Sequence, residues 1–206
     1  MFSVCCQNSL TIYNIVLMNR LRRYLIWLLR CGYCRGFGIQ SPTDYAFVRY
    51  VINEHYPYYS YSDLKTKYPS LSIDDRKLME LYFRISNWLQ PEYAVIHSDR
   101  QKVVRNYVTC GCSGTKVLPV DIFEDLNLKA FLAIFGMNAN YDDFTQILTM
   151  VNEKSAIVVE DIYGSNKRIW KTMGADVKAT VCFDLYYAGI ATFDKTRYKT
   201  NYKINF

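Results

Sequence analysis

Two adjacent carboxylates, Glu160 and Asp161, directly follow the apolar run Ala156–Val159. A short apolar run of this kind predicts a buried strand, and ligands of open α/β sheets bind at the carboxyl ends of the strands. Neighbouring carboxylates there can hold Mg²⁺, or one can act as a general base that the other orients. The alternative is structural: one carboxylate caps the following helix and the other is solvated. Asp161 is therefore a candidate catalytic residue, and both residues are candidate metal ligands.

His97 is the second candidate for catalysis. It follows the apolar run Tyr93–Ile96, so it stands at the end of another predicted strand, where an imidazole can act as a general base. The turn that continues through Ser98–Gln101 contains no glycine. Cofactor-binding turns of such folds normally carry glycines, because a residue without Cβ lets the backbone approach the ligand. The alternative, which we favour, is that the His97 side chain fills the space that a cofactor would occupy.

Other patterns that could do chemistry are few. The chain has two histidines, His55 and His97, and neither has a serine or cysteine at a nucleophile spacing. No P-loop, HExxH or EF-hand pattern is present. Cysteines begin and end the segments Cys31–Cys34 and Cys110–Cys112, but the one-residue spacer of the second does not suit structural zinc. We expect reduced thiols and a cytoplasmic protein, because no convincing secretory signal is present.

Arginine is concentrated in the first fifty residues, where Asp44 is the one acidic residue, and most of the net charge of +6 arises there. Such a patch can contact an anionic partner, such as nucleic acid or a membrane surface, although a solvated face of an amphipathic helix explains it equally well. No sequence-specific nucleic-acid motif is present, and the uncharged residues 9–18 do not form a transmembrane segment. The arginines of the patch are Arg20, Arg22, Arg23, Arg30, Arg35 and Arg49.

Helical periodicity predicts three helices before residue 91. The second begins at an N-cap, Ser41, and ends before Pro57, and the third runs from the N-cap Ser72 to Pro91. Residues 56–61 are rich in tyrosine, which predicts an aromatic packing surface. Residues 1–17 are interpreted as an extension that is poorly ordered or lies upstream of the natural start. The first helix begins at Met18, carries arginines on one face and has an apolar stripe formed by Leu21, Tyr24, Leu25, Leu28 and Leu29.

From residue 92 onward, alternating strand and helix signals predict a Rossmann-like α/β domain with a mostly parallel sheet. Residues 179–206 have strand signals without helices between them, which predicts that the last strands of the sheet pair in antiparallel fashion. We expect a helical N-terminal subdomain over residues 18–91 and an α/β domain over 92–206. The expected strands are Tyr93–Ile96, Lys116–Val120, Ala130–Phe135, Ala156–Val159, Ala179–Leu185, Ile190–Phe193 and Tyr202–Phe206, and the later helices are Gln101–Val108, Asp142–Val151 and Asn166–Met173.

Three segments resemble a bacterial branch of the class I S-adenosylmethionine (SAM)-dependent methyltransferases. Residues 35–42, RGFGIQSP, are similar to the branch's HGFGIHSP segment, and residues 184–190, DLYYAGI, to its DLFxxGL turn. Residues 154–162 are similar to its NSVFVFDDI segment, so the resemblance covers roughly residues 18–206. It implies a class I methyltransferase sheet and, for an active member, SAM as the cofactor.

The cofactor-binding turn of the branch is altered in this chain. Its EIGTSxG pattern falls on residues 95–98, so Val95 stands in place of the acid and His97 in place of the glycine. The FIDGNHxY stretch is similar to residues 134–141. Gly136, Asn138 and Tyr141 match it, and the resemblance implies that these three residues contact the cofactor.

The acid of that stretch is replaced by Phe135. In metal-dependent methyltransferases of similar fold this acid helps to hold a divalent ion, so we do not expect a metal in this chain. Asp121 is the candidate to hold the ribose hydroxyls, in a region that is shortened relative to the branch. These losses predict a methyltransferase-like protein with a degraded cofactor loop that acts as a non-catalytic binding or structural module. The alternative is an active enzyme that methylates an oxygen or nitrogen of a small molecule or sugar.

Overall fold

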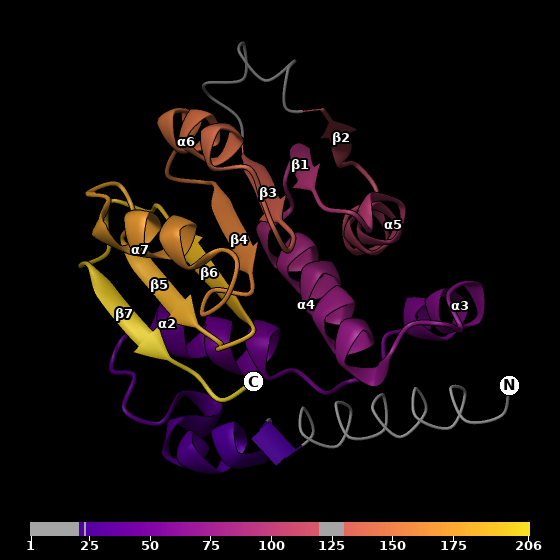
Figure 1. Ribbon diagram of the computed structural model, residues 1–206, viewed down its shortest axis with the longest axis horizontal. Coiled ribbons are helices and arrows are strands. Elements are labelled where there is room, and N and C mark those ends of the chain that lie inside the picture. The colour runs from indigo at the N-terminus through magenta and orange to yellow at the C-terminus, as the bar shows by residue number, and fades with distance from the viewer. Residues whose placement is uncertain (1–20, 23, 120–129) are drawn as a thin grey trace, which may run out of the picture.

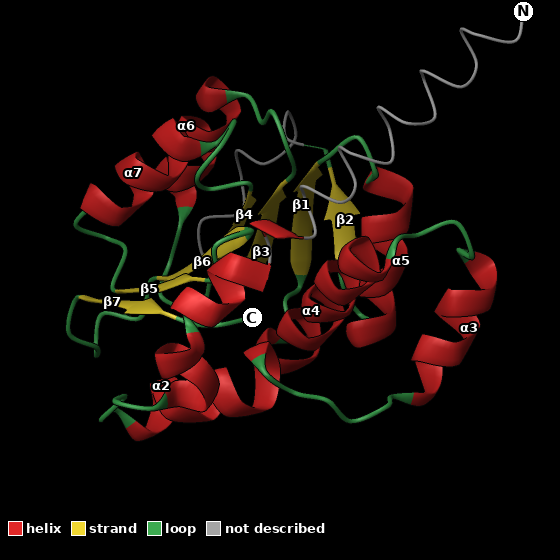
Figure 2. Ribbon diagram, turned by 60° about the horizontal axis from the view of Figure 1, so that its bottom comes forward, coloured by secondary structure: helices red, strands yellow, loops and turns green. Residues whose placement is uncertain are grey.

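A mixed sheet between two layers of helices forms the body of the molecule (Figures 1 and 2). The structure is a computed structural model that describes residues 21–22, 24–119 and 130–206, apart from the side chains of Cys34 and Arg35. Within these residues the sheet has seven strands in the order β2-β1-β3-β4-β6-β5-β7. The strands are β1 Tyr93–His97, β2 Lys116–Leu118, β3 Phe131–Phe135, β4 Ala156–Glu160, β5 Val181–Asp184, β6 Ala188–Thr192 and β7 Thr200–Lys203.

The predicted α/β fold with a mostly parallel sheet is confirmed. The predicted antiparallel finish is confirmed for β6, which runs antiparallel to both β4 and β5. It is wrong for β7, which pairs in parallel with β5. The reason is that β6 returns between β4 and β5, so the chain must cross to the outer side of β5 before β7 can join the sheet.

Two groups of helices cover opposite faces of the sheet (Figure 2). The predicted N-caps are confirmed, because the hydroxyl oxygens of Ser41 and Ser72 accept hydrogen bonds from the amides of Asp44 and Asp75. One face carries α2 Pro42–Phe47, which continues into η2 Val48–Ile52, together with α4 Ile73–Leu89 and α5 Gln101–Gly111. The other face carries α6 Tyr141–Met150 and α7 Lys167–Ala175, and a short helix, η1, spans Cys31–Gly36.

Helix α3, Tyr59–Lys67, was not among the predicted elements. Its sequence has no clear apolar stripe, and only Leu64 of the helix is fully buried. The predicted aromatic packing is confirmed for Tyr58 and Tyr61, whose rings lie 5.0 and 5.1 Å from the ring of Phe83 in α4. Tyr59, by contrast, is 97% exposed. The tyrosines therefore pack α3 against α4 only in part.

Alternation along the strands divides the core into two layers and decides on which face each site residue lies. Ala156 and Val158 of β4 belong to the core beneath α4 and α5, and Glu160 follows them on that face. Val95 of β1 belongs to the core beneath α6 and α7, and His97 follows it. Glu160, a predicted metal ligand, and His97, a predicted catalytic residue, thus lie on opposite faces of the sheet.

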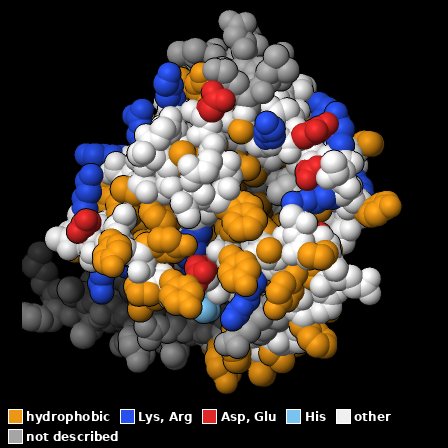
Figure 3. All heavy atoms as spheres, turned by 180° about the vertical axis from the view of Figure 1, so that it is seen from behind, with side chains coloured by type: hydrophobic (Ala, Val, Ile, Leu, Met, Phe, Trp, Pro, Cys, Tyr) orange, Lys and Arg blue, Asp and Glu red, His pale blue; other side chains and the backbone are white. Residues whose placement is uncertain are grey.

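Polar contacts join the first helix to the body. Arg22 is exposed and Arg20 and Arg23 lie outside the described residues, so the solvated arginine face stays a prediction. The described residues 21–22 and 24–29 are helical, and Arg30 follows them. Arg30 donates hydrogen bonds to the carboxylate of Asp184 at 3.0 and 3.2 Å, and Arg22 donates to the hydroxyl oxygen of Tyr186 at 3.1 Å. The apolar stripe is exposed. In the view from behind, hydrophobic side chains gather on the lower half of the molecule (Figure 3).

Several predicted features lie outside the described residues. They include the extension over residues 1–17, the candidate ribose ligand Asp121 and two residues of the arginine patch, Arg20 and Arg23. In the part of the chain that the structure describes, no helix is long and apolar enough to cross a membrane.

The segment that resembles the DLFxxGL turn contains a glycine that the packing requires. A Cβ on Gly189 would lie 2.3 Å from the ring of Trp170, so Gly189→Ala should lower the free energy of unfolding by about 2 kcal/mol through overpacking. Urea denaturation followed by far-UV circular dichroism measures this change. Gly174 in α7 is the matched control, because a Cβ there meets no atom within 4 Å. Gly174→Ala should leave the protein as stable or raise its stability by about 0.5–1 kcal/mol, and equal effects of the two substitutions would contradict this packing.

Candidate functional site

The strand order reverses between β1 and β3, which is the position where open α/β sheets hold ligands. Here the two turns that leave these strands are packed against each other. The amide of Gly136 donates a hydrogen bond to the carbonyl of His97 at 2.7 Å. A Cβ on Gly136 would lie within 3.0 Å of three atoms of Ser98, so only glycine permits this approach. The two turns are therefore in direct contact at this point.

His97 supports the start of α6. Its Nδ1 lies 3.0 Å from a carboxylate oxygen of Asp143, and its Nε2 is 3.5 Å from the amide of Asn140, which donates toward it. Its ring also lies beside Phe135, with the ring centroids 6.2 Å apart. Both ring nitrogens are thus directed at the first turn of α6. A general base would need one of them directed at a substrate.

The residues that stand in place of the branch's acids are part of the core. Val95 and Phe135 are buried beneath α6 and α7, where the Phe135 ring packs edge-on against Phe144. An ionised carboxylate at either position would lose its hydration without a partner of opposite charge. These substitutions therefore suit a packed interior better than a polar ligand site.

Glu160 occupies a buried network at the end of β4. Its carboxylate accepts a hydrogen bond from the hydroxyl of Tyr82 in α4 at 2.6 Å and one from the Arg100 guanidinium at 2.9 Å. Arg100 also donates to Asp75 at the start of α4. The residue is 2% exposed, so the expectation that one of the two adjacent carboxylates is solvated is wrong for Glu160. Charge pairing is what allows the ion to be buried there.

The charges in this network reinforce one another. Burial opposes the charge of Arg100, but the carboxylates of Glu160 and Asp75 outweigh it and raise the pKa of the guanidinium. Burial, together with the Glu160 carboxylate that accepts its proton, raises the pKa of Tyr82 well above its usual value. Tyr82 is therefore a permanent donor, and Arg100 a permanent cation, across the physiological pH range.

Asp161 holds the turn that leads to α7. One oxygen of its carboxylate accepts hydrogen bonds from the amide and the hydroxyl of Ser165, at 2.7 and 2.9 Å. Its backbone is left-handed, with φ of 51°, and its amide donates to the carbonyl of Tyr187. A Cβ on Gly164 would overlap the carboxylate, so any other residue there would displace the Asp161 side chain. Asp161 thus closes the turn before α7 and borders a cavity. The N-cap of α7 is Asn166, and no described side chain caps this helix, so the expectation that one of the two carboxylates caps it is wrong.

The three residues that the resemblance assigns to cofactor contact are built into loop and helix packing. Gly136 lies against Ser98, and the amide of Asn138, a residue with φ of 55°, donates to the hydroxyl oxygen of Ser165. Tyr141 begins α6, and its ring lies 3.9 Å from the guanidinium carbon of Arg168. These contacts join the turn after β3 to the turns after β1 and β4, and α6 to α7. Cofactor contact by the three residues stays a prediction.

A cavity of about 580 Å³ opens beside these turns, and we name it the β4 groove. It contains both signs of charge and several aromatic rings. Asp161 and Glu160 border it, whereas His97 does not, so the two candidate catalytic residues do not share it. The groove is lined by Arg22, Asp74, Asp75, Lys77, Leu78, Arg100, Met137, Glu160, Asp161, Tyr163, Gly164, Tyr186, Tyr187 and Phe206.

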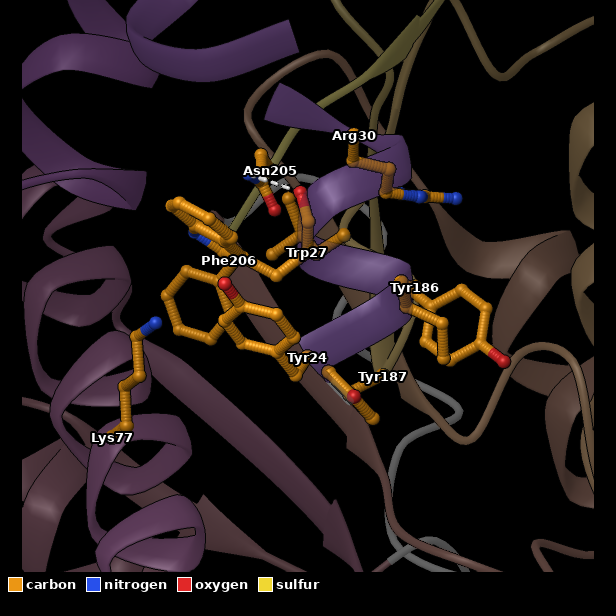
Figure 4. Close-up of a pocket in the computed structure, with 10 residues that line it drawn as sticks. Tyr24, Trp27, Arg30, Lys77, Tyr186, Tyr187, Asn205 and Phe206 are labelled. Carbon is orange, nitrogen blue, oxygen red and sulfur yellow. Dashed lines mark hydrogen bonds between the residues drawn. The ribbon is translucent and has the colours of Figure 1, made fainter. Parts of the chain in front are cut away.

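A second cavity, of about 320 Å³, adjoins the β4 groove and shares four of its lining residues. Figure 4 shows the rings of Tyr24, Trp27 and Phe206 gathered on one side of it, with the Lys77 side chain directed at them. The Lys77 ammonium lies 4.3 Å from the centre of the Phe206 ring. Aromatic rings from the first helix and from the end of the chain thus extend the groove into a longer surface.

Metal binding by Glu160 and Asp161 stays a prediction. The described residues bring no third His, Cys, Asp or Glu side chain to these two to complete a metal site. Over residues 21–22, 24–119 and 130–206, no group of three or more His, Cys, Asp or Glu side chains could hold a metal ion. The Glu160 oxygens contact Tyr82 and Arg100, and one Asp161 oxygen contacts Ser165.

Sequence reasoning missed the residues that organise this edge of the sheet. Arg100 was noted only as part of a glycine-free turn, and Tyr82 lies within the third predicted helix without having been singled out. Asp184 was noted within the DLFxxGL resemblance, but its partners Arg30 and Tyr163 lie far away in the chain. One feature of the sequence could have indicated the network. Glu160 ends an apolar strand, and a carboxylate buried there needs a cation beside it.

Comparison with known proteins adds no relative: no protein-family model matches this chain, and none of the curated proteins is significantly similar to it. The methyltransferase resemblance therefore rests on the sequence segments alone.

The buried network makes a quantitative prediction. Arg100→Leu leaves the Glu160 carboxylate buried without its cation, so the free energy of unfolding should fall by about 3 kcal/mol. Adding Glu160→Gln should recover about half of that loss, because the remaining side chain is neutral. Urea denaturation of the single and double variants measures both changes.

Lys102→Leu is the matched control for this cycle, since Lys102 is an exposed cation two residues after Arg100, in the first turn of α5. It should change stability by less than about 0.5 kcal/mol. If Arg100→Leu were no more destabilising than Lys102→Leu, the Glu160 network would not be the interaction that holds this edge.

Proposed function

We propose that this chain is a methyltransferase-like protein that has lost its SAM site and acts as a non-catalytic binding or structural module. The observation that carries the proposal is the contact between the turns after β1 and β3, where the Gly136 amide bonds to the His97 carbonyl and Ser98 lies against Gly136. A cofactor at the switch point would need that space. The residues around the switch point therefore do not fit SAM.

The position of Arg100 supports the same proposal. In a SAM site, the turn after the first strand must offer backbone groups to the ligand. In this chain the turn carries Arg100 back to Glu160 and Asp75, and the Ser98 hydroxyl oxygen accepts a hydrogen bond from the Arg100 amide at 3.2 Å. The groups that a ligand would contact are engaged with the protein itself. Freeing them would expose the buried carboxylate of Glu160.

The β4 groove is the binding surface in this proposal. Its volume falls within the range of small-molecule sites, about 300–1,000 Å³. Cations, carboxylates and tyrosine rings surround it, which suits a ligand that carries both charges and a planar group. The carboxyl edge of the sheet thus keeps a ligand site, displaced from the switch point toward β4.

The same groove favours a second candidate, an active class I methyltransferase that acts on an oxygen or nitrogen of a small molecule or sugar. SAM itself carries an ammonium, a carboxylate and an aromatic base, and the groove offers groups of matching kinds. Methyl transfer requires mainly alignment of the donor and the nucleophile, and Asp161 at the groove is placed to accept a proton. This candidate places the cofactor in the β4 groove rather than at the switch point.

Calorimetric titration with SAM and S-adenosylhomocysteine separates the two candidates. The binding-module proposal predicts no saturable heat up to about 1 mM ligand, which corresponds to a binding free energy weaker than about 4 kcal/mol. Saturable binding in the micromolar range would overturn the proposal and favour the enzyme.

A variant locates any binding that is observed. Met137 lines the β4 groove and is 54% exposed, so Met137→Arg fills the groove without disturbing the core. If SAM binds in the groove, this substitution should abolish binding, whereas Val177→Arg at an exposed position outside the groove should leave it unchanged. Binding that survives Met137→Arg would place the cofactor elsewhere and exclude the second candidate in this form.

A further inference from the structure

Carboxylates outnumber cations around the β4 groove. Among the described residues, four carboxylates and three cations line it. The Arg100 guanidinium binds two of the carboxylates, those of Glu160 and Asp75. The Lys77 ammonium lies 4.3 Å from the centre of the Phe206 ring, where the groove adjoins the second cavity. The groove therefore favours a positively charged ligand over a negatively charged one.

Asp161 is the carboxylate best placed to bind such a ligand. The amide and the hydroxyl of Ser165 donate to the same oxygen of its carboxylate, at 2.7 and 2.9 Å. Its other oxygen accepts no hydrogen bond from any residue that the structure describes. An ionised carboxylate has about four acceptor positions, so Asp161 keeps capacity for further donors. The side chain is thus held in place by Ser165 with one oxygen left for a ligand.

Tyrosine rings lie beside Asp161. The rings of Tyr163 and Tyr186 are stacked, with their centroids 5.1 Å apart, and Tyr187 meets Tyr186 edge-on at 5.0 Å. All three residues line the groove, and the Asp161 amide donates to the Tyr187 carbonyl. The face of an aromatic ring attracts a cation, and a planar cation can also stack on it. A carboxylate next to such rings provides both contacts that an organic cation needs.

A cation of this chain already reaches this part of the groove. Arg22, in the first helix, donates from its guanidinium to the Tyr186 hydroxyl at 3.1 Å. This hydrogen bond and, to a smaller extent, the charge of Asp161 raise the pKa of the guanidinium. The contact is exposed, so water can replace it at little cost. Arg30, by contrast, is fixed by two hydrogen bonds to the Asp184 carboxylate and is 11% exposed. Arg22 can therefore leave the groove while the helix stays attached through Arg30.

We infer that the β4 groove binds a planar organic cation of the amidinium or guanidinium class, between Asp161 and the tyrosine rings, and that Arg22 holds this place in the free protein. The N–H groups of the ligand donate to the Asp161 oxygen that Ser165 does not use, and its flat face lies against a tyrosine ring. The inference rests on the proposed function, because it names the ligand class of the same groove. It makes Arg22 a competitor that the ligand displaces.

Three compounds of nearly the same shape test the sign of the ligand's charge. Benzamidine carries a positive group, benzamide a neutral one and benzoate a negative one. Each is titrated into the labelled full chain, and the amide resonances of Gly164 and Tyr187 report on the groove. Benzamidine should shift both resonances with a Kd of about 1 mM or lower. Benzamide should bind at least about tenfold more weakly, and benzoate should give no saturable shift, because neither carries the charge that Asp161 attracts.

Substitutions test the two residues that the inference names. Asp161→Asn keeps an acceptor for Ser165 and tolerates the left-handed backbone, but it removes the charge, so it should weaken benzamidine binding about tenfold. Asp99→Asn is the matched control, because Asp99 is exposed and does not line the groove, and it should leave the affinity unchanged. Arg22→Ala should tighten binding by about threefold, since it removes the competitor. Circular dichroism checks that all variants are folded.

Equal affinities for benzamidine and benzamide would overturn the inference, and so would unchanged binding by Asp161→Asn. Weaker binding by Arg22→Ala would make Arg22 part of the ligand site and would also overturn it. Silence toward both benzamidine and SAM would overturn the inference and leave the proposed loss of the SAM site standing. Saturable binding of SAM would overturn the proposed function, whatever the result with benzamidine.

Discussion

A carboxylate buried at the end of β4 constrains the whole carboxyl edge of the sheet. Glu160 is the last residue of its strand, and alternation directs it beneath α4, away from water. Its charge is tolerated there because Tyr82 and Arg100 donate to it. To supply that cation, the turn after β1 must carry Arg100 across the end of the sheet. In a cofactor-binding fold this turn would contact the cofactor, whereas here its Arg100 forms an ion pair inside the protein.

The second constraint is the close approach of the turns after β1 and β3. Gly136 permits it, and the His97 carbonyl is bound directly by the Gly136 amide. The side chain of His97 then reaches the first turn of α6 rather than the ligand edge. In the segments that resemble methyltransferases, the glycines keep a role, but the role is packing: Gly136 against Ser98, and Gly189 against Trp170.

Most of the fold could be predicted from the sequence, because helix caps and apolar runs coincide with the elements and buried residues of the structure over most of the chain. Ser41 and Ser72 cap their helices as expected, and the apolar runs at β1, β3 and β4 are strands. Helix α3 escaped prediction since it buries little, and β7 was given the wrong direction since strand direction depends on where β6 inserts. Contacts between distant residues, such as Arg30 with Asp184, have no local signature.

We propose that the switch point of this sheet does not admit a cofactor. Amide NMR spectroscopy of the labelled protein tests it most directly, because the Gly136 and Ser98 amides report on the two turns that meet there. Addition of S-adenosylhomocysteine to about 1 mM should leave both resonances in place, and the Gly136 amide should exchange slowly with solvent with or without ligand. A saturable shift of the two resonances, or loss of the Gly136 protection when the ligand is added, would contradict the account.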